Sequence, residues 1–141
     1  MNDKFFLDTN ILVYSFDEGA PEKRDRSRQL INLALQSSNG SISIQVVQEF
    51  LNAATRKFST PMTLKDSQKY LRQVMNPLCQ VYTDLPLLEN GLNIQDETSY
   101  SFYDSLILAA AIKANCAVLY SEDLHHGQIV KGVKIVNPYL D

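Results

Sequence analysis

The sequence predicts a single-domain α/β fold, an α/β/α sandwich built on a parallel sheet of about five strands. Short apolar runs alternate with longer segments whose apolar residues have helical periodicity. The short runs are apolar at nearly every position, as in strands that helices cover on both faces. No repeat and no long linker divides the 141 residues, so we expect one domain over 1–141.

Strands are predicted where short apolar runs are bounded by polar residues. The first run, Lys4–Leu7, ends at Asp8, and a polar loop is expected over 121–128. The predicted strands cover 4–7, 41–44, 79–82, 117–120 and 133–136.

Helices are predicted where apolar residues recur at intervals of three or four. Asn39-Gly40 is expected to end one helix, and another is expected to stop before Pro77. The segment 103–115 is apolar almost throughout and should be the most buried helix. The predicted helices cover 10–16, 22–37, 45–58, 63–75, 84–95 and 103–115.

Composition narrows the possible classes of protein. Apolar residues make up 45% of the chain and charged residues 21%, which is typical of a globular domain and excludes a disordered or collagen-like chain. The net charge is −3, so the chain lacks the strongly basic balance of a protein that binds nucleic acid by bulk charge. Any contact with nucleic acid must therefore be local.

The cysteines and the apolar segments indicate where the protein works. Cys79 and Cys116 are too few and too far apart for a disulfide framework or a zinc site, and we expect small buried side chains in a reducing compartment. The apolar stretch 5–16 is interrupted by Asp8 and Asn10 and has no basic region before it, unlike a secretory signal. We therefore expect a cytoplasmic protein with no membrane partner.

Acidic residues fall at comparable ends of four predicted elements. Asp8 ends the first strand, Glu49 lies one turn into the helix after the second, Asp104 opens the most apolar helix, and Asp123 follows 117–120. Each alone has an ordinary explanation as a helix cap, a dipole partner, a solvated face or an Asx turn. In a parallel sheet, however, the carboxyl ends of the strands share one edge. The four carboxylates should meet there and hold Mg²⁺ or Mn²⁺.

A divalent cation at this edge would bind a phosphate oxygen and lower the pKa of a water, which could then attack phosphorus. Such hydrolysis needs no histidine. The adjacent His125 and His126 are expected to have a structural role in the loop or to contact substrate, rather than to act as general acid and base. The side chain of Glu122 is expected to point away from Asp123.

Four segments together resemble the PIN-domain ribonucleases of the VapC toxin type over nearly the full chain. The segments are Phe6–Tyr14, Gln48–Phe50, Tyr103–Ala111 and Ser121–Gly127, the last followed by Asn137-Pro138-Tyr139. The resemblance implies a parallel sheet between helices and cleavage of RNA with acid-held Mg²⁺ or Mn²⁺. It also implies a small antitoxin as partner and a homodimer.

The resemblance also implies a set of site residues. As metal-holding and catalytic acids it implies Asp8, Glu49, Asp104 and Asp123. As supporting polar residues it implies Thr9, Asn10 and Ser121. No acid of the family pattern is missing, so an active enzyme is expected.

Basic residues near these segments are candidates for RNA contact. The candidates are Arg24, Arg28, Arg56 and Lys57. The alternative is that they are solvated helix faces, balanced by acids such as Glu22 and Asp25.

Other classes of protein fit less well. A haloacid-dehalogenase-like phosphatase needs a second Asp two residues after Asp8, where Asn10 stands. A phospho-receiver domain needs paired acids and a late Lys in a context that is absent, and neither glycine-rich nucleotide motif occurs. A non-catalytic module that binds RNA or protein has no need of four converging carboxylates.

Overall fold

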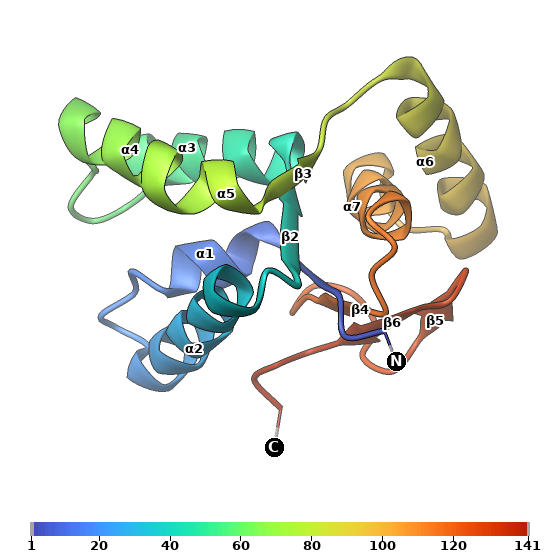
Figure 1. Cartoon of the computed structure of the whole chain (residues 1–141), viewed down its shortest axis with the longest axis horizontal. Helices are drawn as coiled ribbons and strands as arrows, with labels where there is room; N and C mark the ends of the chain where they lie inside the picture. Colours follow the sequence, from blue (N-terminus) through green and yellow to red (C-terminus); the bar gives the residue numbers. More distant parts are fainter. Residues whose placement is uncertain (1, 141) are drawn as a thin grey trace.

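The computed structural model describes residues 2–140 and contains a six-stranded sheet with helices on both sides (Figure 1). The strands are β1 (Phe5–Leu7), β2 (Gly40–Ser43), β3 (Cys79–Val81), β4 (Val118–Tyr120), β5 (Ile129–Val130) and β6 (Val133–Val136). The helices are α1 (Thr9–Tyr14), α2 (Pro21–Ser37), α3 (Ile44–Arg56), α4 (Leu64–Tyr70), α5 (Asn76–Leu78), α6 (Leu85–Thr98) and α7 (Phe102–Lys113), with a π-helical turn η1 (Leu71–Met75) between α4 and α5. The α/β class predicted from the sequence is confirmed.

The sheet order is β3-β2-β1-β4-β6-β5, and β1 pairs in parallel with both β2 and β4. The chain builds the sheet outward in one direction as far as β3, and then returns through α6 and α7 to place β4 on the other side of β1. In open parallel sheets, the carboxyl ends of strands at such a reversal form a crevice. Asp8 follows β1 at this point.

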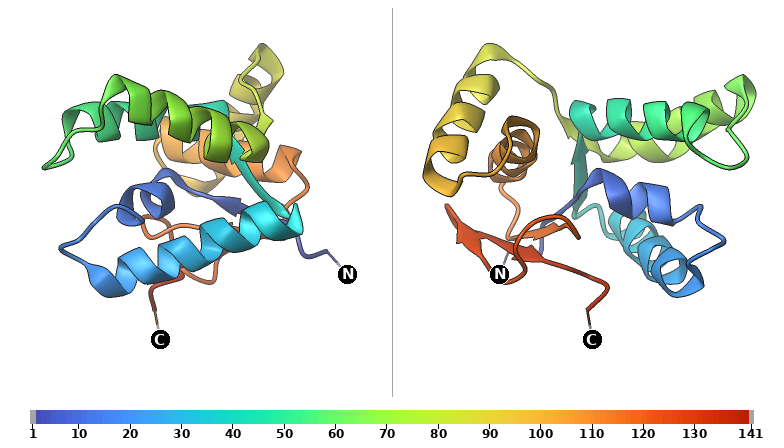
Figure 2. Two further views of the ribbon diagram at one scale, coloured as in Figure 1. Left: turned by 60° about the vertical axis from the view of Figure 1, so that its left-hand side comes forward. Right: turned by 180° about the vertical axis from the view of Figure 1, so that it is seen from behind.

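The two faces of the sheet are covered by different helices. Figures 1 and 2 show α1 and α2 on one side, α6 and α7 on the other, and α3 alongside α4 and α5. Helix α7 is buried at every position from Ser105 to Ala111, as its apolar sequence predicts. No helix in the described part of the chain is long and apolar enough to cross a membrane.

The sheet has one strand more than the number expected. Ile129–Val130 forms β5, which pairs antiparallel with β6. The turn between them consists of Lys131 and Gly132, both with positive φ, as a two-residue hairpin requires. A two-residue strand beside a polar loop has too little pattern to be predicted.

The ends of two helical segments are formed in a different way from the predictions. The left-handed residue after α2 is Ser38 rather than Gly40. Gly40 is instead needed for close packing, because a Cβ there would lie 2.1 Å from Cβ of Ala34. The helical segment predicted to stop before Pro77 continues to Leu78, because η1 widens the turn ahead of a residue that has no N–H to donate.

Candidate functional site

Asp8 links the first strand to the first helix. Leu7 of β1 is in register with Tyr120 of β4, so the next residues, Asp8 and Ser121, emerge side by side. The carboxylate of Asp8 accepts from the backbone N–H of Thr9 at 2.7 Å and from the Ser121 hydroxyl at 2.8 Å. Asp8 is 7% exposed and caps α1. Its carboxylate is therefore held in one orientation by two neutral donors.

Asp123 belongs to the loop that follows β4. Its Oδ2 accepts from Nδ2 of Asn10 at 2.7 Å, and its backbone N–H donates to Oγ of Ser121 at 3.3 Å. Asp123 is therefore held in place from two sides, by the first turn of α1 and by its own loop.

Glu49 is brought to the same place by α3. Ser43 ends β2 and caps α3, so the helix begins at the carboxyl edge of the sheet. Oε1 of Glu49 accepts from the Thr9 hydroxyl at 2.6 Å, and Oε2 from Nε2 of Gln45 at 3.3 Å. Nε2 of Gln45 also donates to the backbone carbonyl of Tyr103, at 3.1 Å. Gln45 was not predicted as a site residue, although its position four residues before Glu49 is the available signal.

Asp104 lies in the first turn of α7, where Ser101 caps the helix and accepts from the Asp104 backbone N–H at 3.1 Å. This places a carboxylate near the positive end of the helix dipole.

All four predicted acids line one pocket of about 990 Å³. The pocket extends from the carboxyl edge of the sheet to the segment that follows α3. Besides the acids, the pocket is lined by residues that were not predicted from the sequence as site residues, apart from Lys57. The apolar ones include Phe16, Phe58 and Met62, and the polar ones include Asn52, Lys57 and Thr60.

The pKa values of two of the four predicted acids are raised in this pocket. Burial raises the pKa of Asp8 to about 6. The hydrogen bonds from Ser121 and Thr9 lower this pKa in part, and the charges of Asp123 and Glu49 raise it further. Partial desolvation, followed by the charge of Asp104, raises the pKa of Asp123. Among residues 2–140, none of the four acids forms an ion pair with Lys or Arg. Proton or cation binding would relieve the repulsion.

The four acids suit a metal ion in their donor chemistry and their charge. Oxygen ligands with excess negative charge suit a hard divalent cation. As oriented, however, no group of three acidic, His or Cys side chains within the described ranges lies close enough to hold an ion. Thr9 and Asn10 hold Glu49 and Asp123 by hydrogen bonds, so the carboxylates would have to turn to share a cation.

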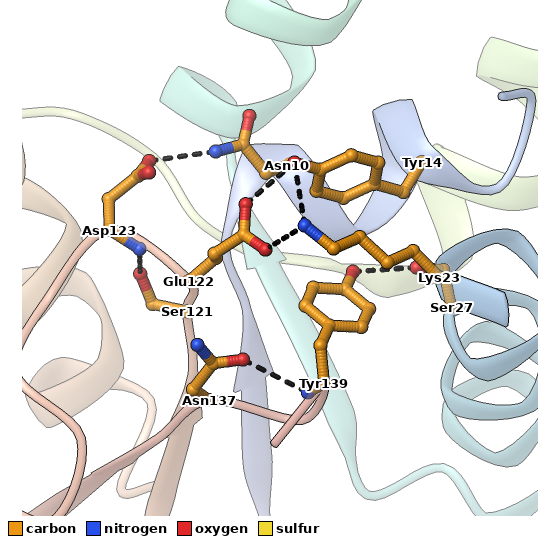
Figure 3. Close-up of polar contacts among 9 residues, drawn as sticks. All are labelled: Asn10, Tyr14, Lys23, Ser27, Ser121, Glu122, Asp123, Asn137 and Tyr139. Carbon is orange, nitrogen blue, oxygen red and sulfur yellow. Dashed lines mark hydrogen bonds and ion pairs between the residues drawn. The ribbon is translucent and has the colours of Figure 1, made fainter. Parts of the chain in front are cut away.

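Glu122 points away from the acids, as expected. Its carboxylate accepts from the Tyr14 hydroxyl at 2.6 Å and pairs with Nζ of Lys23 at 2.5 Å (Figure 3). The two histidines also lie elsewhere in the fold. Nδ1 of His126 accepts from the backbone N–H of Asn137, and the ring of His125 packs edge-on against Tyr100.

The four basic candidates differ in their surroundings. Arg24 pairs with Glu18 at 2.6 Å and with Asp25 at 3.0 Å. Arg28 donates to the backbone carbonyl of Ser15 at 2.8 Å. Lys57 lines the acidic pocket, whereas Arg56 is exposed at the end of α3. Of the four, Lys57 is placed best to meet a ligand in the pocket.

The family model for the PIN domain matches residues 5–131, and the chain belongs to this family. The resemblance stated from the sequence is thereby confirmed. No curated protein matches the chain.

Solved structures share the fold. A toxin–antitoxin complex from Klebsiella pneumoniae is 21% identical, with a TM-score of 0.69 over 96% of this chain and 98% of that chain. A DNA-bound VapBC from Salmonella typhimurium is 19% identical, with a TM-score of 0.62 over 94% and 96% of the two chains. Mycobacterium tuberculosis VapC20, described as a sarcin–ricin loop cleaving toxin, is 19% identical, with a TM-score of 0.58 over 85% and 90%.

Proposed function

We propose that this chain is a metal-dependent endoribonuclease and the toxin of a toxin–antitoxin pair. The observation that supports it best is a pocket at the β1–β4 edge that is lined by all four predicted acids. Asp8, Glu49 and Asp123 accept hydrogen bonds there from neutral side chains, and within residues 2–140 none of the four acids pairs with Lys or Arg. Carboxylates that lie close together without a paired cation destabilise the folded protein. Cation binding is the function that would offset this destabilisation. The proposed catalytic and metal-holding residues are Asp8, Glu49, Asp104 and Asp123.

Mg²⁺ or Mn²⁺, when bound, would supply positive charge that polarises the scissile phosphate and makes a water more acidic. The other tasks belong to the chain. Asp8 is held rigidly by Thr9 and Ser121, and is therefore suited to a fixed place in the site. Glu49 is exposed toward the pocket and is suited to orient the attacking water. In-line attack by this water would cleave the phosphodiester.

The proposed partners are RNA as substrate and an antitoxin protein. Supporting this, two of the structural neighbours are toxin–antitoxin assemblies and a third is described as a sarcin–ricin loop cleaving toxin. The four proposed acids would also receive a cationic side chain, and an Arg of the antitoxin matches carboxylates geometrically. A homodimer stays a prediction from the resemblance.

The direct test is cleavage of single-stranded RNA by the purified chain with Mg²⁺ or Mn²⁺, compared with EDTA. We expect cleavage only with metal, and cleavage slower by about 100-fold or more for Asp8→Asn or Asp104→Asn. Cleavage that persists in EDTA would overturn the metal dependence. Turnover of para-nitrophenyl phosphate without RNA cleavage would favour the phosphatase alternative, although Asn10 is occupied with Asp123 and is not an acid.

A separate test addresses the toxin role. Expression of the chain alone should arrest growth, and coexpression of its antitoxin should relieve the arrest. Normal growth with abundant soluble protein would contradict the toxin role and leave the nuclease proposal to the cleavage assay.

A further inference from the structure

The loop after β4 presents neighbouring side chains to opposite sides. The side chain of Asp123 lines the pocket and accepts from Asn10, and the buried hydroxyl of Ser121 donates to Asp8 behind it. Glu122, between them, turns the other way into a polar cluster formed by α1, α2 and the C-terminal segment (Figure 3). Because the three residues are consecutive, the contacts that hold Glu122 also restrain the backbone between Ser121 and Asp123.

The contacts of Glu122 are short and come from two elements. One carboxylate oxygen accepts from the Tyr14 hydroxyl and the other meets Nζ of Lys23, while the Glu122 side chain is only 23% exposed. Nζ of Lys23 also lies 4.8 Å from the ring centroid of Tyr14 and 5.5 Å from that of Tyr139. The lysine is thus held by a carboxylate and two aromatic rings, and Glu122 cannot turn without losing both partners.

Helix α1 connects this cluster to the pocket. Asn10 and Tyr14 are four residues apart and so lie on one face of the helix. Asn10 holds Asp123 and Tyr14 holds Glu122, so one helical face holds two consecutive residues of the loop. Displacing Glu122 would therefore release the loop from one of its two attachments to α1.

We propose that Glu122, fixed by Tyr14 and Lys23, is a positioning residue that orients Ser121 and Asp123 for cation binding in the acidic pocket. This inference rests on the proposed function. A partly exposed ion pair contributes little to stability. Residues that orient ligands from behind, by contrast, commonly change metal affinity or activity by about 10- to 100-fold when removed.

The matched pair of variants is Tyr14→Phe and Tyr139→Phe. Both remove one hydroxyl and keep the ring, and the two rings pack edge-on against each other. The Tyr14 hydroxyl bonds Glu122, whereas the Tyr139 hydroxyl bonds Ser27 at 2.6 Å. If the cluster only holds the C-terminal segment against α2, both variants should behave alike.

The affinity for Mn²⁺ is measured by electron paramagnetic resonance on the intact chain. We expect Glu122→Ala to bind Mn²⁺ about 10- to 100-fold more weakly. Tyr14→Phe should bind more weakly than the wild type by a smaller factor, and Tyr139→Phe should bind like the wild type. Lys23→Met should follow Glu122→Ala, with Lys23→Arg restoring part of the affinity. In RNA cleavage at saturating substrate, the loss should appear in kcat rather than in KM.

Hydrogen exchange of the Asp123 amide provides a readout without metal. That N–H donates to Ser121, and its exchange should accelerate in Glu122→Ala and Tyr14→Phe but not in Tyr139→Phe. Unchanged exchange, or Mn²⁺ affinity equal to the wild type in Glu122→Ala and Tyr14→Phe, would overturn the positioning role. Absence of Mn²⁺ binding by the wild type would instead overturn the proposed function.

Discussion

Nδ2 of Asn10 donates to Oδ2 of Asp123 at 2.7 Å, joining residues that are 113 positions apart in the chain. The bond connects the first turn of α1 to the loop after β4, across the strands on either side of the point where the sheet order reverses. At the same edge, Thr9 holds Glu49 and Ser121 holds Asp8. A neutral donor therefore orients each of three acids without cancelling its charge.

The first prediction concerns the four acids. Asp8→Asn, Asp104→Asn and Asp123→Asn keep the side-chain shape and remove one charge each, so RNA cleavage with Mg²⁺ should fall by about 100-fold or more. Glu49→Gln should be milder. Initial rates on single-stranded RNA measure the effect, with the exposed Asp96→Asn as the matched control. Wild-type rates for Asp8→Asn and Asp104→Asn would contradict the assignment.

The second prediction is a pH dependence of stability without metal. The pKa of Asp8 is about 6 in the folded protein against 3.8 as the ordinary value, because of burial and the nearby Asp123 and Glu49. The folded state therefore binds the proton more tightly, and the resulting stabilisation is complete below about pH 4 and lost as pH rises through 6. It corresponds to a free energy on the order of 3 kcal/mol.

Urea denaturation in EDTA measures this. The free energy of unfolding of Asp8→Asn minus that of wild type should increase between pH 4 and pH 7.5, because the variant cannot lose this proton. Mg²⁺ at 100 times its dissociation constant should then stabilise the wild type at pH 7.5 by about 2.7 kcal/mol, and the variant by less. Parallel pH curves for the two proteins would show that Asp8 titrates normally.

The third prediction separates the basic candidates. Lys57 lines the pocket, whereas Arg24 is engaged by Glu18 and Asp25. Lys57→Ala should lower kcat/KM for RNA by about 3- to 10-fold, or roughly 1 kcal/mol, with a weaker salt dependence. Arg24→Ala should change kcat/KM by less than about twofold, because its charge is already paired. Equal losses in both variants would assign RNA contact to α2 as well.

The fourth prediction concerns packing of α2 on the sheet. A methyl group at Gly40 would lie 2.1 Å from Cβ of Ala34, so Gly40→Ala should destabilise the fold by about 1–3 kcal/mol. The double variant Gly40→Ala with Ala34→Gly should recover only a small part of that loss, because the second change removes the opposing methyl group but leaves the backbone Cα of residue 34 at 2.7 Å. Thermal unfolding measures both, and a Gly40→Ala variant as stable as the wild type would refute the close contact.

Much of the fold was predictable because it depends on short segments. The apolar run before Asp8, the spacing of apolar residues over 22–37 and the uninterrupted apolar segment over 103–115 each reflect local burial, and β1, α2 and α7 lie there. The failures were also local. A π-helical turn carries the chain past Pro77, and the two-residue strand Ile129–Val130 is too short to show a pattern.

The sequence by itself determined that four acids fall at the ends of elements of a parallel sheet, and the PIN-domain family follows from the same segments. Only the tertiary structure decided which groups meet them. It placed Ser121 against Asp8, Gln45 against Glu49, and Glu122 with Lys23 and Tyr14. Most of these partners are far apart in the chain. Their pairing depends on strand register and on the direction of each loop, which no local pattern of residues encodes.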